Sequence, residues 1–409
     1  MDIKEIRSHF PMLSSDKTMQ NHPLVYLDNA STTFKPQCVI DAIADYYMNY
    51  SVNSHRGDYD LAHQVDTKYE EARQVVADFI HARKEEIIFT SGTSMSLNLV
   101  AHGYGLKYLT SEDEVLLTQA EHASNVLPWF HVKDVTGCSI GYIPLDEDGR
   151  LTVENVKKAI TPRTKVISIA HVTNVLGYVV DIKAICEVAH EHNIIVVVDG
   201  AQSVPHQLTD VRELGCDFLA FSGHKMCGPT GVGVLYGRYD LLKEMDPLMS
   251  GGGMNARFDM CGEVSLLLPP YKFEAGTQNI AGALGLASAI KFLTSIGMEN
   301  IEKREKELRE YAIKRFEEIE GITVYNKNAE AGIITFNLEG VFAQDLATHL
   351  NAKGICVRSG QHCAKILMDF LKCYATVRAS LYFYNTEEEI DSLVEALKTG
   401  GDFLDAYFN

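Results

Sequence analysis

The run Ile194–Val198 constrains the fold more than any other stretch of the sequence. Every side chain in it is β-branched and apolar, so the strand that it predicts must be buried on both faces. Such a strand belongs in the centre of a mostly parallel sheet that helices cover on either side. Short β-branched runs alternate with helical patterns from about residue 25 onward. The sequence therefore predicts an α/β fold.

The length and a change of pattern predict two domains. A chain of 409 residues with 46% hydrophobic residues exceeds the usual size of one domain. After Ala283 the pattern changes to long helices and then to alternating strands. We expect a large domain at 18–285 and a smaller α+β domain formed by 1–17 and 286–409. The smaller domain is expected to end in a helix with a capping box from Thr386 to Glu389.

Charge and cysteine usage exclude several classes of protein. The formal net charge is −18 and no basic block is present, which argues against nucleic acid or an anionic membrane as a partner. No apolar run approaches the roughly 20 residues that span a bilayer, and the N-terminal residues lack the pattern of a signal peptide. The nine cysteines contain no CxxC pair, so neither a disulfide framework nor a metal site is indicated. A cytoplasmic location is expected.

One lysine stands where a buried strand runs into a glycine-rich loop. Lys225 lies in the segment FSGHKMCGPTGVG, directly after the apolar run at Phe218–Phe221. Partial desolvation there would make its amine lose a proton more easily, and only a neutral amine attacks an aldehyde. Taken alone, however, the segment favours an ordinary solvated loop lysine.

Polar side chains gather just past the ends of the predicted strands, where ligands of parallel sheets bind. They are Thr93, His122, Asn174, Asp199, Gln202, Ser222, His224 and Lys225. Taken individually, Asp199 could merely cap the turn that follows it, and Thr93 could be an ordinary N-cap of a helix. Together they match a pyridine aldehyde phosphate, which needs an amine, a carboxylate for its ring nitrogen, a flat group over its ring, a donor for its phenolic oxygen and hydroxyls for its phosphate.

A cysteine near the C-terminus forms a second chemical centre. Cys363 follows a histidine in a glycine-containing loop, and Arg358 and Arg378 lie near it in the sequence. Cations beside a thiol favour its reactive thiolate form. From these residues alone a buried, inert thiol is the simpler interpretation, as it is for Cys356 and Cys373.

Ordered segments over nearly the whole chain carry a family resemblance. They read YLDNASTT, NSHRGDY, FTSGTSMSLNLVA, AEHASNVLPW, HVTNVLG, VVVDGAQSVPH, FSGHKMCGPTGVGVLYG, FEAGTQNIAGALGL, VRSGQHCAKILM and VRASLYFYNTEEEID. The chain thereby resembles aminotransferase class V, a branch of the pyridoxal-phosphate enzymes, and within it the Suf-type cysteine desulfurase and selenocysteine lyase family. The resemblance implies pyridoxal 5′-phosphate as cofactor and fold type I, with a mostly parallel seven-stranded sheet in the large domain. It also implies a homodimer with shared active sites.

The resemblance also assigns roles to individual residues. Lys225 would hold the cofactor aldehyde and act in catalysis, Asp199 would pair with the ring nitrogen, and His122 would stack on the ring and act in catalysis. The remaining expected cofactor contacts are Gln202 at the phenolic oxygen and, at the phosphate, Thr93, Ser94, Ser222, His224 and the neighbouring subunit's Thr277. The expected substrate contacts are Asn174, Arg378, Ala30, His55 and Arg56, the last two from the neighbouring subunit.

The implied reaction converts L-cysteine to L-alanine and leaves a persulfide on Cys363, which supplies sulfur for iron–sulfur cluster assembly. The chain departs from the family pattern at Ala123, Gln278 and Gln361, and at Phe342 where relatives that pass sulfur to a zinc-binding scaffold carry histidine. The sulfur acceptor therefore stays unidentified. Two alternatives remain open, namely a selenocysteine lyase and a catalytically silent sulfur carrier.

Overall fold

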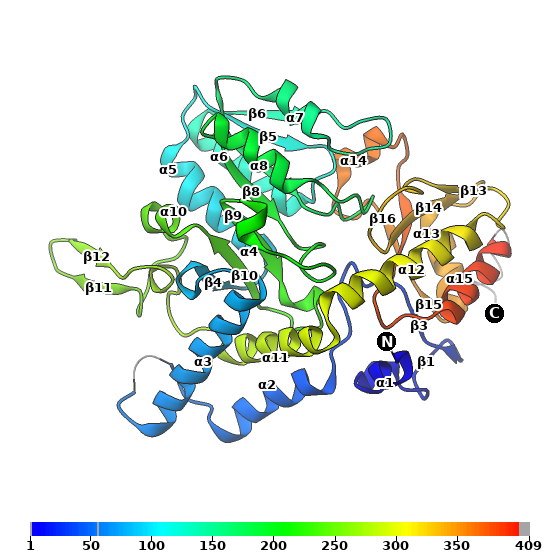
Figure 1. Cartoon of the computed structure of the whole chain (residues 1–409), viewed down its shortest axis with the longest axis horizontal. Coiled ribbons are helices and arrows are strands. Elements are labelled where there is room, and N and C mark those ends of the chain that lie inside the picture. The colour runs from blue at the N-terminus through cyan, green and yellow to red at the C-terminus, as the bar shows by residue number, and fades with distance from the viewer. Residues whose placement is uncertain (1, 55–56, 401–409) are drawn as a thin grey trace.

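A seven-stranded sheet forms the centre of the molecule. The computed structural model describes residues 2–54 and 57–400. The strand order is β4-β10-β9-β8-β7-β5-β6, and β10 alone runs antiparallel to its two neighbours (Figure 1). In that order the bounds are Ile87–Thr90, Gly233–Gly237, Phe218–Ser222, Ile195–Asp199, Thr164–Ala170, Glu114–Thr118 and Ser139–Ile143. The predicted mostly parallel seven-stranded sheet is confirmed.

Helices cover both faces of this sheet because its central strands are apolar on both sides. Val196 and Val198 of β8 belong to one hydrophobic cluster and Val197 to the other, as alternating side chains require. The first cluster draws on α2 (Gln37–Asn49), α3 (Asp60–Phe79), α8 (Ile182–Glu191) and α11 (Ile280–Ile296), and the second on α4 (Thr93–Val100), α6 (Leu127–Thr136) and α10 (Tyr239–Glu244). The central position predicted for this strand is confirmed.

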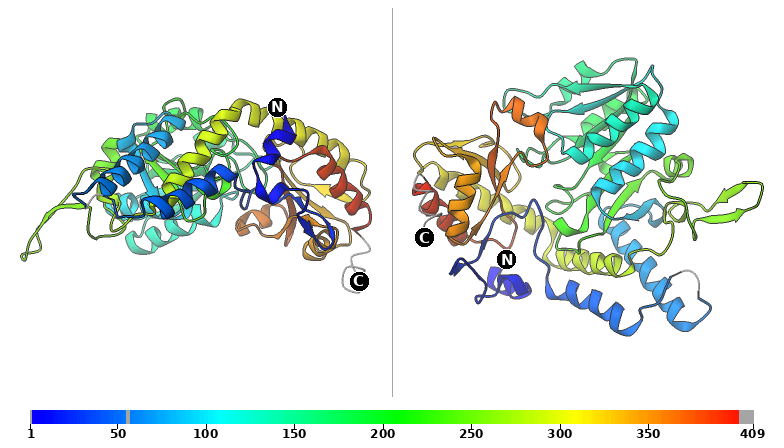
Figure 2. Two further views of the ribbon diagram at one scale, coloured as in Figure 1. Left: turned by 90° about the horizontal axis from the view of Figure 1, so that it is seen from below. Right: turned by 180° about the vertical axis from the view of Figure 1, so that it is seen from behind.

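The C-terminal part builds a smaller antiparallel sheet in the order β13-β14-β17-β16. Its strands span Ile322–Val324, Ile333–Leu338, Thr376–Ser380 and Arg358–Gly360, and its helices are α12 (Met298–Phe316), α13 (Ala343–Ala352), α14 (Lys365–Phe370) and α15 (Glu387–Lys398). The capping box predicted at the start of α15 is present, because the Thr386 hydroxyl accepts from the Glu389 N–H while the Glu389 carboxylate accepts from the Thr386 N–H. This unit lies beside the large sheet, and α11 and α12 run from one to the other (Figure 2).

The N-terminal residues pack partly against this C-terminal unit. Strand β3 (Val25–Tyr26) pairs in parallel with β15 (Ile355–Cys356), and Val25 and Leu27 join the hydrophobic cluster of that unit. The chain therefore crosses between the two units near Asp28, which forms an isolated bridge with Ser380. The division at residues 17/18 and 285/286 stays a prediction.

Shorter elements complete the fold. A hairpin of β11 and β12 projects from the large unit (Figure 1). The remaining bounds are α1 (Ile3–Ser8), β1 (Thr18–Met19), β2 (His22–Pro23), α5 (Leu106–Tyr108), α7 (Val153–Ala159), α9 (Val211–Leu214), β11 (Asn255–Phe258) and β12 (Val264–Leu266), with short 3-10 helices at Pro11–Leu13, Lys84–Glu86, Ala123–Asn125, Gly223–Lys225 and Tyr271–Phe273 and a π-helix at Ala101–Gly105.

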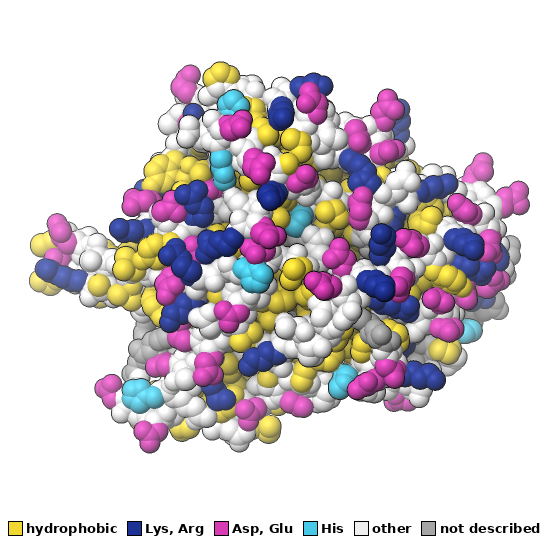
Figure 3. Space-filling view, in the orientation of Figure 1, with side chains coloured by type: hydrophobic (Ala, Val, Ile, Leu, Met, Phe, Trp, Pro, Cys, Tyr) yellow, Lys and Arg dark blue, Asp and Glu magenta, His cyan; other side chains and the backbone are white. Residues whose placement is uncertain are grey.

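The surface mixes charges of both signs. Figure 3 shows Lys and Arg side chains interspersed with Asp and Glu over the visible face. Within residues 2–54 and 57–400, no single helix is long and apolar enough to cross a membrane. The two helices α11 and α12 pass that test only together, and they meet at an angle of 73°.

A buried ion pair ties α3 to the segment that precedes Gly276 and Thr277. Arg73 is fully buried, and its two terminal nitrogens lie 2.6 and 2.8 Å from the two carboxylate oxygens of Glu274. Arg73 also donates to the backbone oxygen of Ile87 at 2.8 Å. Because both charges are desolvated, each requires the other.

Replacing Arg73 by methionine should therefore lower the free energy of unfolding by about 3–5 kcal/mol, since Glu274 would be left as an unpaired buried charge. Urea denaturation measures the change. The control is Lys158→Ala, which breaks an exposed pair with Glu154 and should cost less than about 0.5 kcal/mol. Equal losses in the two variants would contradict the assignment.

Candidate active site

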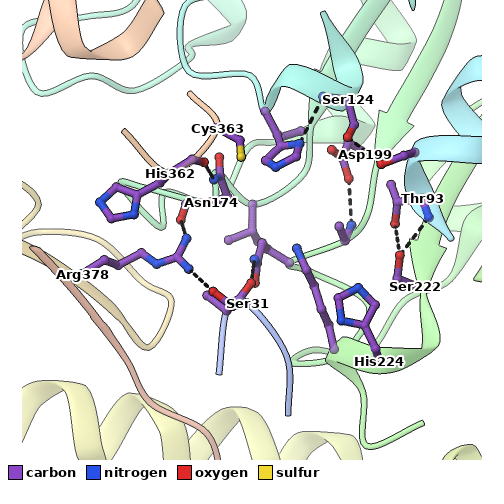
Figure 4. Close-up of a pocket in the computed structure, with 18 of the residues that line it drawn as sticks. Ser31, Thr93, Ser124, Asn174, Asp199, Ser222, His224, His362, Cys363 and Arg378 are labelled. Atoms are coloured by element: carbon purple, nitrogen blue, oxygen red, sulfur yellow. Dashed lines mark hydrogen bonds between the residues drawn. The ribbon is translucent and has the colours of Figure 1, made fainter. Parts of the chain in front are cut away.

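A cavity of about 200 Å³ opens where β7, β8 and β9 end (Figure 4). Residues from the large sheet, the C-terminal unit and the segment after β3 meet there. The lining comprises Ala30, Ser31, Thr93, Ser94, His122, Ser124, Ala170, Val172, Asn174, Asp199, Ala201, Gln202, Ser222, His224, Lys225, Arg358, His362, Cys363 and Arg378. The polar side chains that follow the strands of the large sheet therefore meet in one cavity, as the sequence predicts.

A carboxylate and an amine line the cavity just past two neighbouring strands. Asp199 ends β8 and accepts from the N–H of Ala201 at 2.9 Å. Burial raises the pKa of the Asp199 carboxyl, and that N–H and the charge of Lys225 oppose the rise. Lys225 ends the turn after β9, where desolvation lowers its pKa to about 8, against the pull of Asp199 and with help from Arg378 and Arg358. About a tenth of this amine is therefore neutral at pH 7, against well under a thousandth for an ordinary lysine.

The ring of His122 is neutral and has a fixed tautomer. The Ser124 N–H donates to Nδ1 of His122 at 3.1 Å, so that nitrogen carries no proton. Burial, followed by the charges of Lys225 and Arg378, lowers the pKa of His122 to about 4. An uncharged flat ring at the edge of the cavity suits stacking on an aromatic ligand.

Hydroxyl groups line the cavity at the start of α4. The Thr93 N–H donates to Oγ of Ser222 at 2.8 Å, and the two hydroxyls lie 2.7 Å apart. Ser94 and Ser124 share a further hydroxyl contact of 2.6 Å. Close approach of β10 requires glycine here, since a Cβ on Gly233 would lie 2.4 Å from Cα of Gly92. The hydroxyls and the positive helix end together suit a phosphate.

A buried guanidinium forms the opposite wall. Arg378 donates from Nη1 to the Asn174 backbone oxygen at 2.7 Å and from Nη2 to Oγ of Ser31 at 3.0 Å (Figure 4). Ser31 also accepts from Arg358 at 2.8 Å. Burial lowers the pKa of Arg378 to about 10, and the charge of Asp28 opposes the shift. The arginine still carries its charge at neutral pH, so it can receive an anionic group.

The Cys363 loop closes the cavity from the C-terminal unit. The Cys363 side chain is exposed and lines the cavity, whereas the preceding His362 is buried and its Nε2 lies 2.9 Å from Oγ1 of Thr376. Desolvation and the charge of Arg378 lower the pKa of His362 to about 3. Half-buried Cys356 and Cys373 do not line the cavity.

Several buried polar atoms around the cavity lack a partner and so indicate a polar ligand. Gln202 donates from Nε2 to the Ala30 backbone oxygen at 2.7 Å, but its Oε1 has no hydrogen bond. Oδ1 of Asn174 and Nε of Arg378 are also unpaired. Buried polar atoms in folded proteins are nearly always hydrogen-bonded. An amine, a carboxylate, a neutral ring, a hydroxyl cradle and these unpaired atoms together fit pyridoxal phosphate and an amino-acid substrate.

Known proteins are similar to this chain over its length. The family model of aminotransferase class V matches residues 25–393. A probable cysteine desulfurase of Halalkalibacterium halodurans is 49% identical over 411 residues, which cover 100% of both chains. The chain belongs to the cysteine desulfurase family. Its cofactor is accordingly pyridoxal 5′-phosphate.

Solved structures of family members have the same fold. The cysteine desulfurase CsdA of Escherichia coli superposes with a TM-score of 0.91 at 34% identity and covers 98% of this chain and 99% of its own. A cysteine desulfurase of Thermococcus onnurineus gives 0.91 at 38% identity, with 97% of each chain covered. Fold type I, which the sequence resemblance predicts, is therefore confirmed.

Most of the predicted site residues meet in the cavity, and a few do not. Thr277 is exposed and does not line it, although Gly276 borders a neighbouring hollow with Glu274. The predicted residues His55 and Arg56 lie outside the described part of the chain. No group of three or more possible metal ligands occurs within residues 2–54 and 57–400.

Four polar residues that line the cavity were not among the predicted site residues, namely Ser31, Ser124, Arg358 and His362. Each lies inside a segment that the family resemblance already marked. Arg358 was the easiest of them to predict as a site residue, since it is a second cation in the segment that carries Cys363. Ser31 could be assigned only through its hydrogen bonds to two arginines.

The lowered pKa of Lys225 predicts how cofactor capture depends on pH. Because only the neutral amine attacks an aldehyde, the rate at which cofactor-free protein takes up pyridoxal phosphate should rise with pH, reach half its maximum near 8 and then level off. Stopped-flow absorbance measures the rate. Asp199→Asn should move the midpoint to lower pH, since the Asp199 charge raises the pKa of Lys225. A rate that keeps rising to a pH of about 10 would contradict the lowered pKa.

Proposed function

We propose that the chain converts L-cysteine to L-alanine and receives the released sulfur as a persulfide on Cys363. The observation that carries this proposal is the exposed thiol of Cys363 in one cavity with the amine of Lys225 and the guanidinium of Arg378. The family to which the chain belongs supports the reaction. All the residue types that a pyridoxal phosphate site needs are present in the cavity, which argues against a catalytically silent sulfur carrier.

The substrate carboxylate binds to Arg378. A guanidinium offers two parallel N–H donors, which match the two oxygens of a carboxylate, and its Nε has no partner within the described structure. Asn174 assists this grip, because its backbone oxygen accepts from Nη1 of Arg378 at 2.7 Å and so fixes the guanidinium. This grip orients the α-carbon toward the cofactor and the side-chain sulfur toward Cys363.

The cofactor is held by the residues at the strand ends. Asp199 would pair with its ring nitrogen, His122 would stack on its ring, Gln202 would bind its phenolic oxygen, and Thr93, Ser94, Ser222 and His224 would hold its phosphate. When bound, pyridoxal phosphate supplies a sink for the electrons released at the substrate α-carbon. Lys225 accepts the proton from that carbon, for which its pKa of about 8 is suited.

Cys363 takes the sulfur by nucleophilic attack. Its thiolate attacks the substrate sulfur, so an S–S bond forms as the bond between the substrate β-carbon and sulfur breaks. The electron pair of the broken bond goes to carbon, and the β-carbon gains a proton. L-Cysteine and the protein thiol thus give L-alanine and the protein persulfide, with no external oxidant or reductant.

A second protein must then accept this sulfur, and iron–sulfur cluster assembly is the destination typical of the family. The acceptor is a thiol-bearing partner of unidentified sequence, because transfer from a persulfide needs a nucleophilic sulfur. A cytoplasmic location agrees with the nine cysteines, all of which lie in the described residues and are unpaired.

The active unit is a homodimer in which Thr277 completes the phosphate site of the neighbouring subunit. Support comes from its position, since Thr277 is exposed and follows three residues after Glu274, which the buried Arg73 fixes. An exposed hydroxyl held by a rigid anchor is suited to serve a partner's site. His55 and Arg56 are proposed to approach the substrate from the same neighbouring subunit.

Thr277→Ala should therefore weaken pyridoxal phosphate binding about tenfold, because one hydrogen bond to a charged group would be lost. Equilibrium dialysis of the cofactor measures this change, and sedimentation gives the mass of the assembly. Thr277→Ser retains the hydroxyl and should bind as the unchanged protein does. A monomer that binds the cofactor equally well with and without the hydroxyl would refute shared sites.

Cys363→Ser should reduce alanine formation from L-cysteine at least about 100-fold, because a hydroxyl is a far weaker nucleophile toward sulfur than a thiolate. The absorption band of the bound cofactor should stay unchanged. Cys373→Ser, at a thiol outside the cavity, serves as the control and should retain activity. Cysteine turnover that survives Cys363→Ser would remove Cys363 from the mechanism.

Arg378→Lys tests the carboxylate grip. Lysine keeps the charge but cannot offer two parallel donors, so the KM for L-cysteine should rise about tenfold or more. Initial rates of alanine formation over a range of cysteine concentrations measure it. Arg358→Lys, at the exposed neighbouring cation, should change KM less. An unchanged KM in Arg378→Lys would place the carboxylate elsewhere.

A further inference from the structure

The loop that carries Cys363 has an unusual backbone. His362 and Cys363 both adopt the left-handed conformation, with φ of 50° and 56°. That conformation is unfavourable for residues such as histidine and cysteine, because their Cβ approaches the following carbonyl oxygen. Two such residues in succession persist only where contacts from the surroundings hold them.

Two hydrogen bonds from loops that follow strands of the large sheet hold these two residues. The main-chain N–H of Ala123 donates to the backbone oxygen of Cys363 at 2.7 Å. The side-chain amide of Asn174 donates from Nδ2 to the backbone oxygen of His362 at 2.8 Å (Figure 4). Both strained residues are thus bonded across the cavity, one to the loop after β5 and the other to the loop after β7.

The donor Ala123 itself sits on a rigid turn. The buried carboxylate of Glu121 accepts from the Thr118 hydroxyl at 2.7 Å and from the Asn125 amide at 2.8 Å. Asn125 in turn accepts from the Ser168 hydroxyl at 2.6 Å, which ties the turn to β7. No member of this network touches the cavity, so its role is to fix the turn.

The loop that carries Asn174, the other donor, is bonded to the C-terminal unit. Asn326 donates to the backbone oxygen of Leu176 at 2.8 Å, and Thr335 donates to the backbone oxygen of Val175. The loop of Asn174 is thereby bonded to the same C-terminal unit that carries Cys363. Both loops that donate to the Cys363 loop are therefore fixed by hydrogen bonds of their own.

We propose that Ala123 is a positioning residue whose main-chain N–H, together with the amide of Asn174, clasps the Cys363 loop and holds its thiol for attack on the substrate sulfur. The proposal rests on the proposed function, in which Cys363 is the nucleophile. Because His122 immediately precedes Ala123, the clasp sets the position of the thiol relative to the residue that lies on the cofactor ring.

A backbone donor can be removed by proline, and this site tolerates one. Ala123 is the first residue of a short 3-10 helix, where proline is accepted, and His122 has φ of −65° and ψ of 145°, which suits a residue before proline. Ala123→Pro deletes the N–H and places a ring carbon against the Cys363 oxygen. Ala123→Ser keeps the N–H and is the matched control.

The first readout needs no turnover. In the holoenzyme, hydrogen–deuterium exchange of residues 359–364 should be about tenfold faster in Ala123→Pro than in Ala123→Ser, because one hydrogen bond of the clasp is gone. Unchanged exchange in the folded proline variant would overturn the clasp. If that variant does not fold, Asn174→Asp removes the other donor and should accelerate exchange in the same peptide, and its failure to do so would be equally decisive.

The second readout separates positioning from general damage. Ala123→Pro should lower kcat for L-cysteine about 100-fold with little change in KM, since a displacement of about 1 Å is enough for such a loss. L-Selenocysteine should be turned over at the level of Ala123→Ser, because the weaker carbon–selenium bond depends less on a placed thiol. Equal losses for both amino acids would overturn the proposal. Failure of the unchanged chain to form alanine from cysteine would refute the proposed function instead, while the exchange result would still decide the clasp.

Discussion

The active site depends on desolvation at the carboxyl edge of the central sheet. Strands β8 and β9 are apolar on both faces, so the side chains that end them stand between the packed core and the cavity. Asp199 ends β8 and Lys225 ends the short turn after β9, and burial there raises the pKa of the acid and lowers that of the amine. The sheet thereby produces a partly neutral lysine beside a carboxylate, which is the condition for capturing an aldehyde cofactor.

The substrate side of the cavity comes from a different part of the chain. Arg378 and Cys363 belong to the C-terminal unit, whereas Ser31 follows strand β3, which pairs with β15 of that unit. Bonds from Asn326 and Thr335 to the loop of Asn174 fix the two units against each other. The cavity therefore joins a cofactor half and a sulfur half, and the distance between them is set by hydrogen bonds that cross from one unit to the other.

The sequence predicts which polar residues the large sheet brings to the cavity, because that placement follows from local patterns. A β-branched run such as Ile194–Val198 predicts a buried strand, and the first polar residue after it must lie at the carboxyl end of that strand. The sulfur half depends on contacts between distant segments. The hydrogen bonds from Arg358 and Arg378 to Ser31 join residues more than 300 positions apart, and no periodicity reveals them. The exposed position of Thr277 likewise follows from tertiary structure alone.

In the proposed reaction sulfur leaves the substrate and arrives at one cysteine out of nine. The most direct test is a single turnover of the holoenzyme with L-cysteine in the absence of an acceptor, followed by alkylation, digestion without reductant and mass analysis of the peptides. We expect one additional sulfur atom on the peptide that contains Cys363 and none on the other cysteines. Alanine formed in equal amount with no added sulfur on Cys363 would contradict it.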